Sequence, residues 1–289
     1  MAMHATVLNV LIAVRPNTIA GNGEAQVRVL LVPDKPSWSV DRIARALVVH
    51  NRDSSLSLDV LPLKGNVGRF LSEEKAYDRV LMMTFQQLDL LPWYKSIDSE
   101  RFLVGVHSHH SFDKQLLTTP AHDEEPPNKL VRTLRKFRAV NVVSKRLFNL
   151  FSDKGLNLWS TENGVDIDEF HPIRPISASG PLRVGFAGTA KGIHDKRKGL
   201  TEFVIPACRA VGVELATAIA RTDTHLVPST MCDFYNSVDV LLLPSSSEGF
   251  SLAALEAAAC GRVVISTRVG GSTELITDGV NGFLVDRTV

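Results

Sequence analysis

Residues 237–285 read SVDVLLLPSSSEGFSLAALEAAACGRVVISTRVGGSTELITDGVNGFLV, and this stretch decides the fold. It opens with an apolar run, 239–243, which ends at a proline and predicts a buried strand. A loop of serines follows, and then an alanine-rich segment, 251–260, whose first residue, Ser251, suits the N-cap of a helix. A second apolar run, 262–267, predicts the next strand. This order of strand, loop, helix and strand is typical of a parallel sheet.

The same alternation continues outward from this stretch. Short runs rich in Val, Leu and Ile recur between amphipathic segments, as in sheets that are covered on both faces. The other expected strands lie at 27–32, 79–85, 102–107, 139–143, 156–161, 182–188, 213–220 and 282–285. Helices are expected at 39–49, where apolar residues follow helical spacing, and at 199–211, 229–237 and 272–277. We therefore predict an α/β protein with doubly wound, Rossmann-like sheets.

A break in the pattern predicts two domains. Residues 173–181, IRPISASGP, lose periodicity and collect Pro, Ser and Gly, which is typical of a linker. We assign 27–172 to an N-terminal domain and 182–289 to a C-terminal domain. Residues 1–26 are an extension of unknown role. Two such domains are expected to face a cleft between the carboxyl ends of their sheets, where open α/β sheets bind ligands.

Length and composition agree with a globular protein of this size. The chain has 289 residues, of which 44% are hydrophobic and 22% charged, so a disordered chain and a fibrous repeat are both excluded. The formal charge is +1, from 32 Lys and Arg against 31 Asp and Glu. This balance gives no strong signal for nucleic-acid binding, and any anion site must be local.

The cysteines and the apolar runs bear on the compartment. Cys208, Cys232 and Cys260 are an odd number at wide spacing, which argues against a disulfide framework and offers no paired zinc ligands. The apolar run at 7–14 is far shorter than the roughly 20 residues that span a bilayer. It also lacks the basic flank of a signal peptide. We expect a cytoplasmic protein, and peripheral contact with the inner face of a membrane stays open.

The serine-rich loop, 245–250, has the features of an anion site. It opens onto a helix N-terminus, where free amides and about half a positive charge favour phosphate. Gly249 lets the backbone approach a ligand closely. Glu248 and Glu256 cannot share a helix face, but they can reach different parts of one long ligand, and carboxylates accept well from sugar hydroxyls. Taken singly, Glu248 is equally typical of a solvated loop, and Glu256 of a residue that caps a neighbouring amide.

Together the two carboxylates form a recognisable pattern. Glu, seven residues and Glu, within PSSSEGFSLAALEAAACG and before VGGSTELITDGVNGFLV, resembles the retaining nucleotide-sugar glycosyltransferases of family four, which have the GT-B fold. The resemblance covers about 27–289. Its other parts are VVSKRLFNLF at 142–151, ENGVDIDEFHP at 162–172, and GFAG at 185–188 with the later Lys198-Gly199.

The resemblance implies roles for single residues. Glu256 binds the ribose hydroxyls, and Glu248 holds hydroxyls of the donor sugar. Gly249 and Phe250 present backbone amides to the donor at the helix that Ser251 caps. Lys198 meets the diphosphate. A fixed ammonium and helix amides can stabilise a departing diphosphate without a metal. Metal independence is usual in the fold that the resemblance implies, so we expect neither a metal nor a cofactor besides the nucleotide sugar.

One departure from the family concerns the diphosphate. The family commonly has an Arg directly after the glycine that ends the first strand of this domain, and here Thr189 follows Gly188. Thr189 is therefore expected at the donor in place of a cation. Lys191, Lys196 and Arg197 are candidates for the missing charge, and the alternative is that this basic run is a solvated face.

Two further segments of the N-terminal domain carry candidates. VGVHSHHSFDK, 104–114, has three histidines within four residues, but no Cys or carboxylate set accompanies them as in a zinc site. The resemblance implies that His107 lies near the transferred sugar; the alternative is a histidine satisfied at a strand edge. His109, on the same strand face, and Trp38 are acceptor-side candidates. Trp38 suits either stacking on a sugar or anchoring a helix start.

We therefore predict an enzyme that transfers a sugar from a nucleoside diphosphate donor to an acceptor hydroxyl with retention. No pair of carboxylates suits a retaining glycosidase mechanism, and the resemblance implies attack from the same face of the sugar. The acceptor is a glycan, a lipid or another hydroxyl compound. A non-catalytic nucleotide-sugar-binding protein and a nucleotide-sugar epimerase are the alternatives. Because the chain stops seven residues after Gly282, we expect a fragment or a compact variant of the fold.

Overall fold

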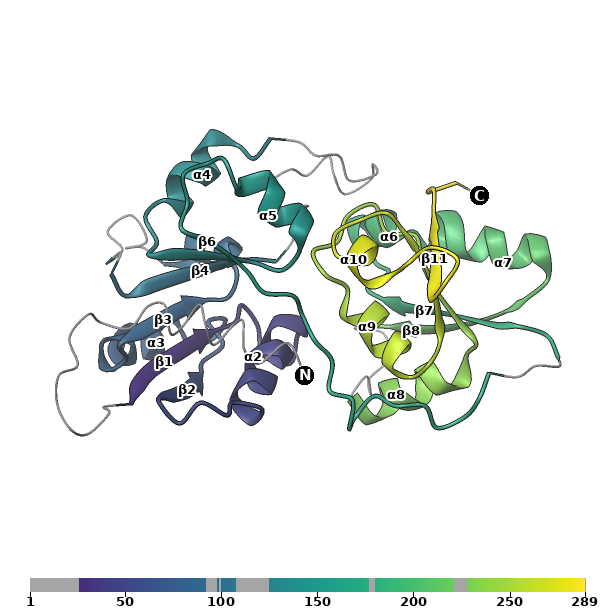
Figure 1. The fold of residues 1–289 in the computed structure, drawn as a ribbon, viewed down its shortest axis with the longest axis horizontal. Coiled ribbons are helices and arrows are strands. Elements are labelled where there is room, and N and C mark those ends of the chain that lie inside the picture. Colours follow the sequence, from purple (N-terminus) through teal and green to yellow (C-terminus); the bar gives the residue numbers. More distant parts are fainter. Residues whose placement is uncertain are drawn as a thin grey trace. The chain divides into compact units, whose positions relative to one another are not determined.

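The computed structural model describes residues 26–91, 98, 100–107, 125–176, 180–220 and 228–288. The chain forms two compact units, which are coloured purple to teal and teal to yellow in Figure 1. The described part of the first unit ends at Asn163, and the second unit takes over at Gly164.

The first unit is built on one parallel sheet. Its six strands are ordered β2-β1-β3-β4-β5-β6. They are β1 Val27–Val32, β2 Leu56–Val60, β3 Arg79–Met82, β4 Phe102–Val106, β5 Ala139–Val142 and β6 Leu158–Ser160. Every neighbouring pair is parallel. The central strands are buried on both faces, which explains their nearly continuous apolar sequences.

Helices cover both faces of this sheet. They are α2 Ser39–Val49, α3 Val67–Glu73, α4 Asn128–Leu134 and α5 Lys145–Phe151, with short 3₁₀ turns at Glu74–Ala76 and Phe85–Leu90. The chain moves one way from β1 to β2 and the opposite way from β4 to β6. Right-handed crossovers therefore place α2 on one face and α4 with α5 on the other, as Figure 1 shows.

The second unit repeats the architecture with five parallel strands, ordered β11-β10-β9-β7-β8. The strands are β7 Arg183–Gly188, β8 Glu214–Ile219, β9 Val240–Leu243, β10 Val263–Thr267 and β11 Gly282–Val285. The helices are α6 Ile193–Lys198, α7 Ile205–Val211, α8 Pro228–Ser237, α9 Leu252–Ala259 and α10 Ser272–Leu275, with a π-helical turn at Leu200–Val204. The two predicted doubly wound sheets are confirmed.

The core of the second unit centres on α8 and α9. Tyr235 on α8 is fully buried, and its ring packs against Phe170 and Phe234. The alanine-rich sequence of α9 lets this helix lie close to α8, because Ala254 and Ala257 are buried without filling much space. This packing sets the position of the helix that follows the serine-rich loop.

The first residues of the predicted linker, and the residues just before it, are tied to the second unit. The Asn236 side chain accepts from the Ile173 amide at 2.8 Å and donates to the His171 carbonyl at 3.0 Å. The buried Arg262 guanidinium donates to the Arg174 carbonyl at 2.6 Å. These bonds satisfy backbone groups of 171–174, so the second unit begins nine residues before the predicted linker start at 173.

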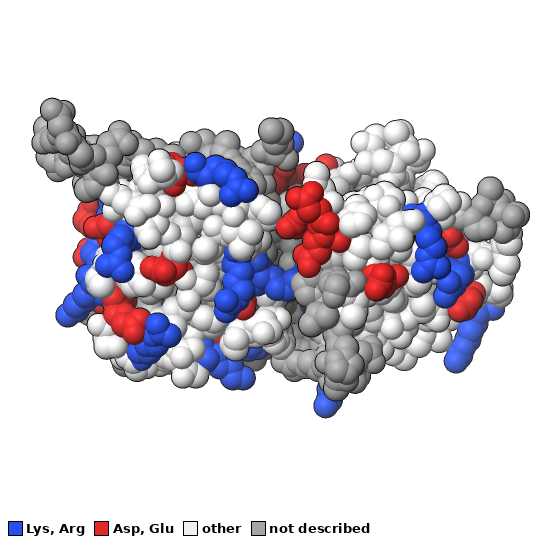
Figure 2. All heavy atoms as spheres, turned by 90° about the horizontal axis from the view of Figure 1, so that it is seen from below, with Lys and Arg blue, Asp and Glu red and all other residues white. Residues whose placement is uncertain are grey.

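Among the described residues, no helix combines the length and the apolar character needed to cross a membrane. On the face seen in Figure 2, acidic and basic side chains are interspersed over the described surface. That pattern matches the balanced charge of the whole chain.

Candidate active site

The second sheet has a topological switch point beside β7. From β7 the chain goes out to β8, then crosses back past β7 to β9, so loops leave the carboxyl ends of β7 and β9 in opposite directions. Open α/β sheets bind ligands at such points. The segment 189–198 follows β7, and the loop 244–251, here called the serine loop, follows β9.

The two segments meet in a buried cluster of charged side chains. Lys198 Nζ donates to Glu248 Oε1 at 2.5 Å, and Arg197 NH1 donates to the same oxygen at 3.2 Å. The exposed fractions of the three side chains are only 12%, 9% and 14% for Lys198, Arg197 and Glu248. Arg197 NH1 also donates to the Ser247 carbonyl at 2.9 Å. We call Arg197, Lys198 and Glu248 the Glu248 cluster.

The cluster carries an unbalanced charge. Burial by itself would raise the pKa of Glu248, but Lys198 and Arg197 outweigh it and lower that pKa to about 2. Burial also lowers the pKa of Lys198, and Glu248 opposes this shift. With both cations protonated and Glu248 ionised, the three side chains sum to one positive charge. The cluster therefore favours a further anion beside it.

Acid is expected to weaken the fold through Glu248. The folded pKa of about 2 lies below the ordinary value of 4.5, so the unfolded chain takes up the proton first as the pH falls. The stabilisation is therefore complete above about 4.5 and is lost as the pH falls towards 2. Denaturant unfolding at a series of pH values should show the free-energy gap between the parent protein and Glu248→Gln narrowing in that window. A gap that does not change with pH would contradict the ion pairs.

Two consecutive glycines support the serine loop from the side of β10. A Cβ on Gly270 would lie 2.2 Å from the Gly249 carbonyl oxygen and 2.3 Å from that of Glu248. A Cβ on Gly271 would lie 2.1 Å from the Phe250 ring, and the Gly271 amide donates to the Gly249 carbonyl at 2.7 Å. Glycine is thus required at 270 because the backbone of the serine loop touches it, and at 271 because the Phe250 ring does.

Hydrogen bonds from neighbouring elements fix the serine loop. Thr267 Oγ1 donates to the Ser245 carbonyl at 2.5 Å, and the Ser246 amide donates to the Arg197 carbonyl at 2.8 Å. Ser251 caps α9 by accepting from the Ala254 amide at 3.3 Å, which confirms the predicted N-cap. The loop is therefore tied to β10, α6 and α9.

Glu256 lies deeper than Glu248. It is buried on α9, and its Oε2 accepts from the hydroxyl of Tyr235 on α8 at 2.8 Å. The sequence analysis considered Glu256 as a ribose ligand or as a cap of a neighbouring amide, and it did not predict this bond to Tyr235. The bond fixes a carboxylate between two packed helices.

The structure separates the candidates for the missing diphosphate charge. Thr189 is half-buried after β7. Lys191 and Lys196 are exposed, whereas Arg197 is buried in the Glu248 cluster. The stem of Lys198 passes 3.7 Å from the position that a Cβ on Gly188 would take. Of the three candidates, Arg197 is therefore the one that contacts Glu248 together with Lys198.

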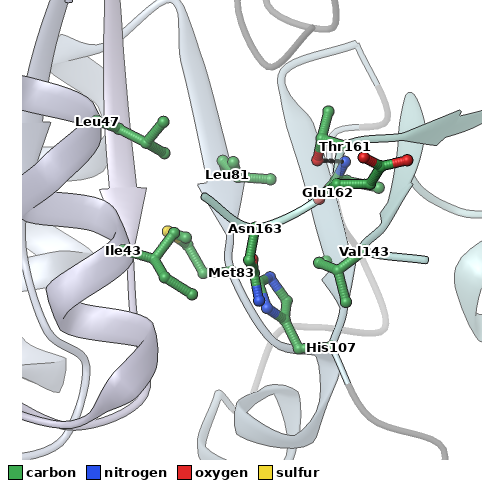
Figure 3. Close-up of a pocket in the computed structure, with 11 residues that line it drawn as sticks. Ile43, Leu47, Leu81, Met83, His107, Val143, Thr161, Glu162 and Asn163 are labelled. Carbon is green, nitrogen blue, oxygen red and sulfur yellow. Dashed lines mark hydrogen bonds between the residues drawn. The ribbon is translucent and has the colours of Figure 1, made fainter. Parts of the chain in front are cut away.

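The first unit contains a small cavity on the α2 face of its sheet, shown in Figure 3. Its apolar lining includes Ile43 and Leu47 of α2. The polar side chains in its lining belong to His107, Asn141, Thr161, Glu162 and Asn163. Asn141 donates to Thr161 Oγ1 at 2.5 Å, the bond dashed in Figure 3.

His107 is the predicted site residue in this cavity. It follows the end of β4, and burial lowers its pKa from 6.5 to about 4. The imidazole is therefore neutral at neutral pH, with one nitrogen able to donate and the other to accept. Sequence reasoning overlooked Asn141 and Thr161, although polar residues in and directly after apolar strands were a usable signal.

Of the two acceptor-side candidates, the structure describes only Trp38. Trp38 precedes α2, and Lys35 Nζ lies 4.2 Å from the centre of its ring. His109 lies outside the described residues. Within the described ranges, no group of three or more His, Cys, Asp or Glu is placed to hold a metal ion.

Comparison with protein families bears directly on the Glu248 cluster. The model described as "Glycosyl transferases group 1" matches residues 187–288, which contain all three cluster residues. Residues 187–288 belong to this family.

Curated glycosyl transferases match parts of the chain. "D-inositol 3-phosphate glycosyltransferase" of Acidothermus cellulolyticus is 48% identical over 79 residues, which are 27% of this chain and 18% of the relative. The protein of the same name from Nocardiopsis dassonvillei is 36% identical over 104 residues, 36% of this chain and 23% of the relative. The matched segments thus span 18% and 23% of the lengths of these relatives.

Solved structures of other proteins match most of the chain. HepE of Anabaena, crystallised with UDP and glucose, aligns with a TM-score of 0.58 at 18% identity and covers 90% of this chain and 86% of its own. Sucrose-phosphate synthase from Thermosynechococcus elongatus aligns with a TM-score of 0.63 at 13% identity and covers 91% and 87%. These likenesses confirm the predicted GT-B fold.

Proposed function

We propose that this protein is a retaining glycosyltransferase that moves a sugar from a nucleoside diphosphate sugar to an acceptor hydroxyl. The observation that carries the proposal is the Glu248 cluster, which lies at the switch point and within the group 1 segment 187–288. Its surplus positive charge suits a diphosphate, and its carboxylate suits a sugar hydroxyl. The complex of HepE with UDP and glucose supports this class of donor.

Lys198 and the N-terminus of α9 act on the departing diphosphate in this proposal. The ammonium is held at 2.5 Å from Glu248 Oε1 and is largely buried, so it is in place before any ligand arrives. Free amides at the start of α9 add partial positive charge. Such preorganised groups stabilise charge that develops in the transition state, and no metal is needed for this step.

Glu248 holds the donor sugar. Both cations of the cluster contact Oε1, which leaves Oε2 to accept from a sugar hydroxyl. Gly249 and Phe250 present their amides to the donor, and Thr189 lies at its diphosphate. His107 donates to a sugar hydroxyl through its neutral ring. All these roles follow from the family resemblance and are part of the proposal.

The proposal also covers the acceptor and the place where the protein acts. Trp38 and His109 remain acceptor-side candidates, and the acceptor is a glycan, a lipid or another hydroxyl compound. We infer action in the cytoplasm, at the inner face of a membrane where the acceptor is a lipid. Basic side chains on α4, α5 and the turn after α4 support contact with an anionic surface. The exposed ones are Lys129, Arg132, Arg135, Lys136 and Lys145.

A donor screen tests the proposed function. Thermal shifts with UDP-, GDP- and ADP-sugars identify the nucleotide, and radiolabelled donor then reveals turnover. Transfer or slow hydrolysis of the donor supports a glycosyltransferase. Affinity without turnover indicates a nucleotide-sugar-binding protein, and conversion of the donor without an acceptor indicates an epimerase. The absence of any nucleotide binding would refute all three.

Glu256→Gln is expected to weaken binding of free nucleoside diphosphate by about tenfold or more. A ribose hydroxyl that donates to a buried carboxylate loses a charged partner, which is worth roughly 1.5–3 kcal/mol. Titration calorimetry with the diphosphate measures the effect. Tyr235→Phe is the matched control, because it removes the hydroxyl that donates to Glu256 but leaves the carboxylate. Unchanged affinity in a folded Glu256→Gln protein would remove Glu256 from the site.

A further inference from the structure

We propose that Arg197 is a positioning residue, which holds the serine loop and the Glu248 carboxylate in place and does not bind the diphosphate itself. The inference rests on the proposed function for its effect on turnover. Arg197 is the buried member of the three basic residues considered for the missing diphosphate charge, and the inference gives it a different role.

Arg197 contacts three successive residues of the serine loop. Its carbonyl accepts from the Ser246 amide at 2.8 Å. Its NH1 donates to the Ser247 carbonyl at 2.9 Å and to Glu248 Oε1 at 3.2 Å. Main chain and side chain of one residue therefore both fix the loop. The guanidinium is planar, so a bond to the fixed Ser247 carbonyl also orients the bond to the carboxylate.

The surroundings of the guanidinium distinguish it from the neighbouring ammonium. NH1 carries two hydrogens, and the Ser247 carbonyl and Glu248 take both. Nε is buried and has no hydrogen-bond partner among the described residues. The second amino group, NH2, has two further hydrogens, so it is the pair of fixed NH1 bonds, and not a lack of donors, that assigns Arg197 to the loop. The ammonium of Lys198 has three hydrogens and donates to Glu248. Lys198 therefore has donors for a phosphate oxygen.

These contacts give Arg197 and Lys198 different roles. Because Arg197 holds Glu248 independently of Lys198, the ammonium can turn to the diphosphate while the carboxylate keeps its direction towards the sugar. Loss of Arg197 should therefore resemble the loss of Glu248, with slower transfer, and should differ from the loss of Lys198, with weaker diphosphate binding. Differential binding separates the two cases.

Four variants test the inference: Arg197→Lys, Arg197→Met, Lys198→Met and Glu248→Gln. Arg197→Lys keeps the charge but cannot reproduce both NH1 bonds. We expect it to bind free diphosphate within about threefold of the parent protein and to transfer sugar about tenfold more slowly at saturating donor, because one charge-assisted bond is lost. Arg197→Met should follow the same pattern. Lys198→Met should lose most of its diphosphate affinity.

Hydrogen exchange of residues 244–251 gives a readout that needs no ligand. The amides of this segment should exchange on the order of tenfold faster in Arg197→Met than in Lys198→Met, since of these two side chains only that of Arg197 is seen to bond the loop backbone, at the Ser247 carbonyl. Equal exchange in the two variants would overturn the inference. So would a loss of diphosphate affinity in Arg197→Lys as large as in Lys198→Met. Failure of the parent protein to bind any nucleotide would instead refute the proposed function, and the exchange result would still decide the role of Arg197 in the loop.

Discussion

Replacing Lys198 by methionine is expected to slow sugar transfer by about a hundredfold at saturating donor, the usual cost of losing one preorganised charge-stabilising group. Methionine keeps the length and apolar character of the stem that passes close to Gly188, so packing changes little. What disappears is the buried ammonium that lies 2.5 Å from Glu248 Oε1. Initial rates with labelled donor measure the effect.

The matched control for Lys198→Met is Lys196→Met. Lys196 lies on the same short helix, α6, but is exposed and outside the Glu248 cluster. Its replacement should leave turnover within about twofold of the parent rate, because exposed charges are strongly screened by water. If both variants turn over equally fast, the ammonium of Lys198 has no role in the transition state.

Gly270→Ala is expected to destabilise the second unit by on the order of 3 kcal/mol and to abolish donor binding. Its Cβ would lie 2.2 Å and 2.3 Å from the carbonyl oxygens of Gly249 and Glu248. These are backbone atoms of the serine loop, and they cannot turn aside as a flexible side chain does. The loop must move away, and Glu248 moves with it. Denaturant unfolding and diphosphate titration measure the two effects.

Gly279→Ala isolates the cost of the backbone conformation. Gly279 also has a positive φ, +74° against +50° at Gly270, but an added Cβ there would meet nothing within 4 Å. This variant should therefore lose only about 1 kcal/mol and keep its diphosphate affinity. Equal losses in the two alanine variants would show that the positive φ, and not contact with the serine loop, explains the requirement for glycine.

Strands with continuous apolar runs were predicted well from the sequence, because buried parallel strands need no alternation. β1, for example, spans the predicted 27–32. β2, Leu56–Val60, was missed, because its apolar residues alternate with Ser57 and Asp59 at the edge of the sheet. α3 was missed as well, since it is short and contains Gly68.

The candidate site was predicted in its parts but not in its contacts. The serine loop, its helix cap and the two carboxylates follow from local sequence. The meeting of Lys198 and Glu248, fifty positions apart, depends on strand order, because β7 lies between β8 and β9. The helix α6 has no apolar periodicity, and its basic run was equally typical of a solvated face. Burial of Arg197 against the serine loop was beyond any pattern in the sequence.

The pairing of Glu248 with two cations has a consequence for the empty protein. Two buried cations without a counter-ion would be costly, so a site that waits for a diphosphate needs a stand-in anion. Glu248 plays this part through Oε1. If the proposed function holds, an arriving diphosphate takes over the ammonium, which relieves Oε1 of one cation and frees it for the sugar carried by the same molecule. A free monosaccharide brings no such anion, so Oε1 stays bonded to both cations and cannot accept from the sugar. The diphosphate and the sugar of one donor molecule thus strengthen each other's binding, and a free monosaccharide binds without that gain in affinity.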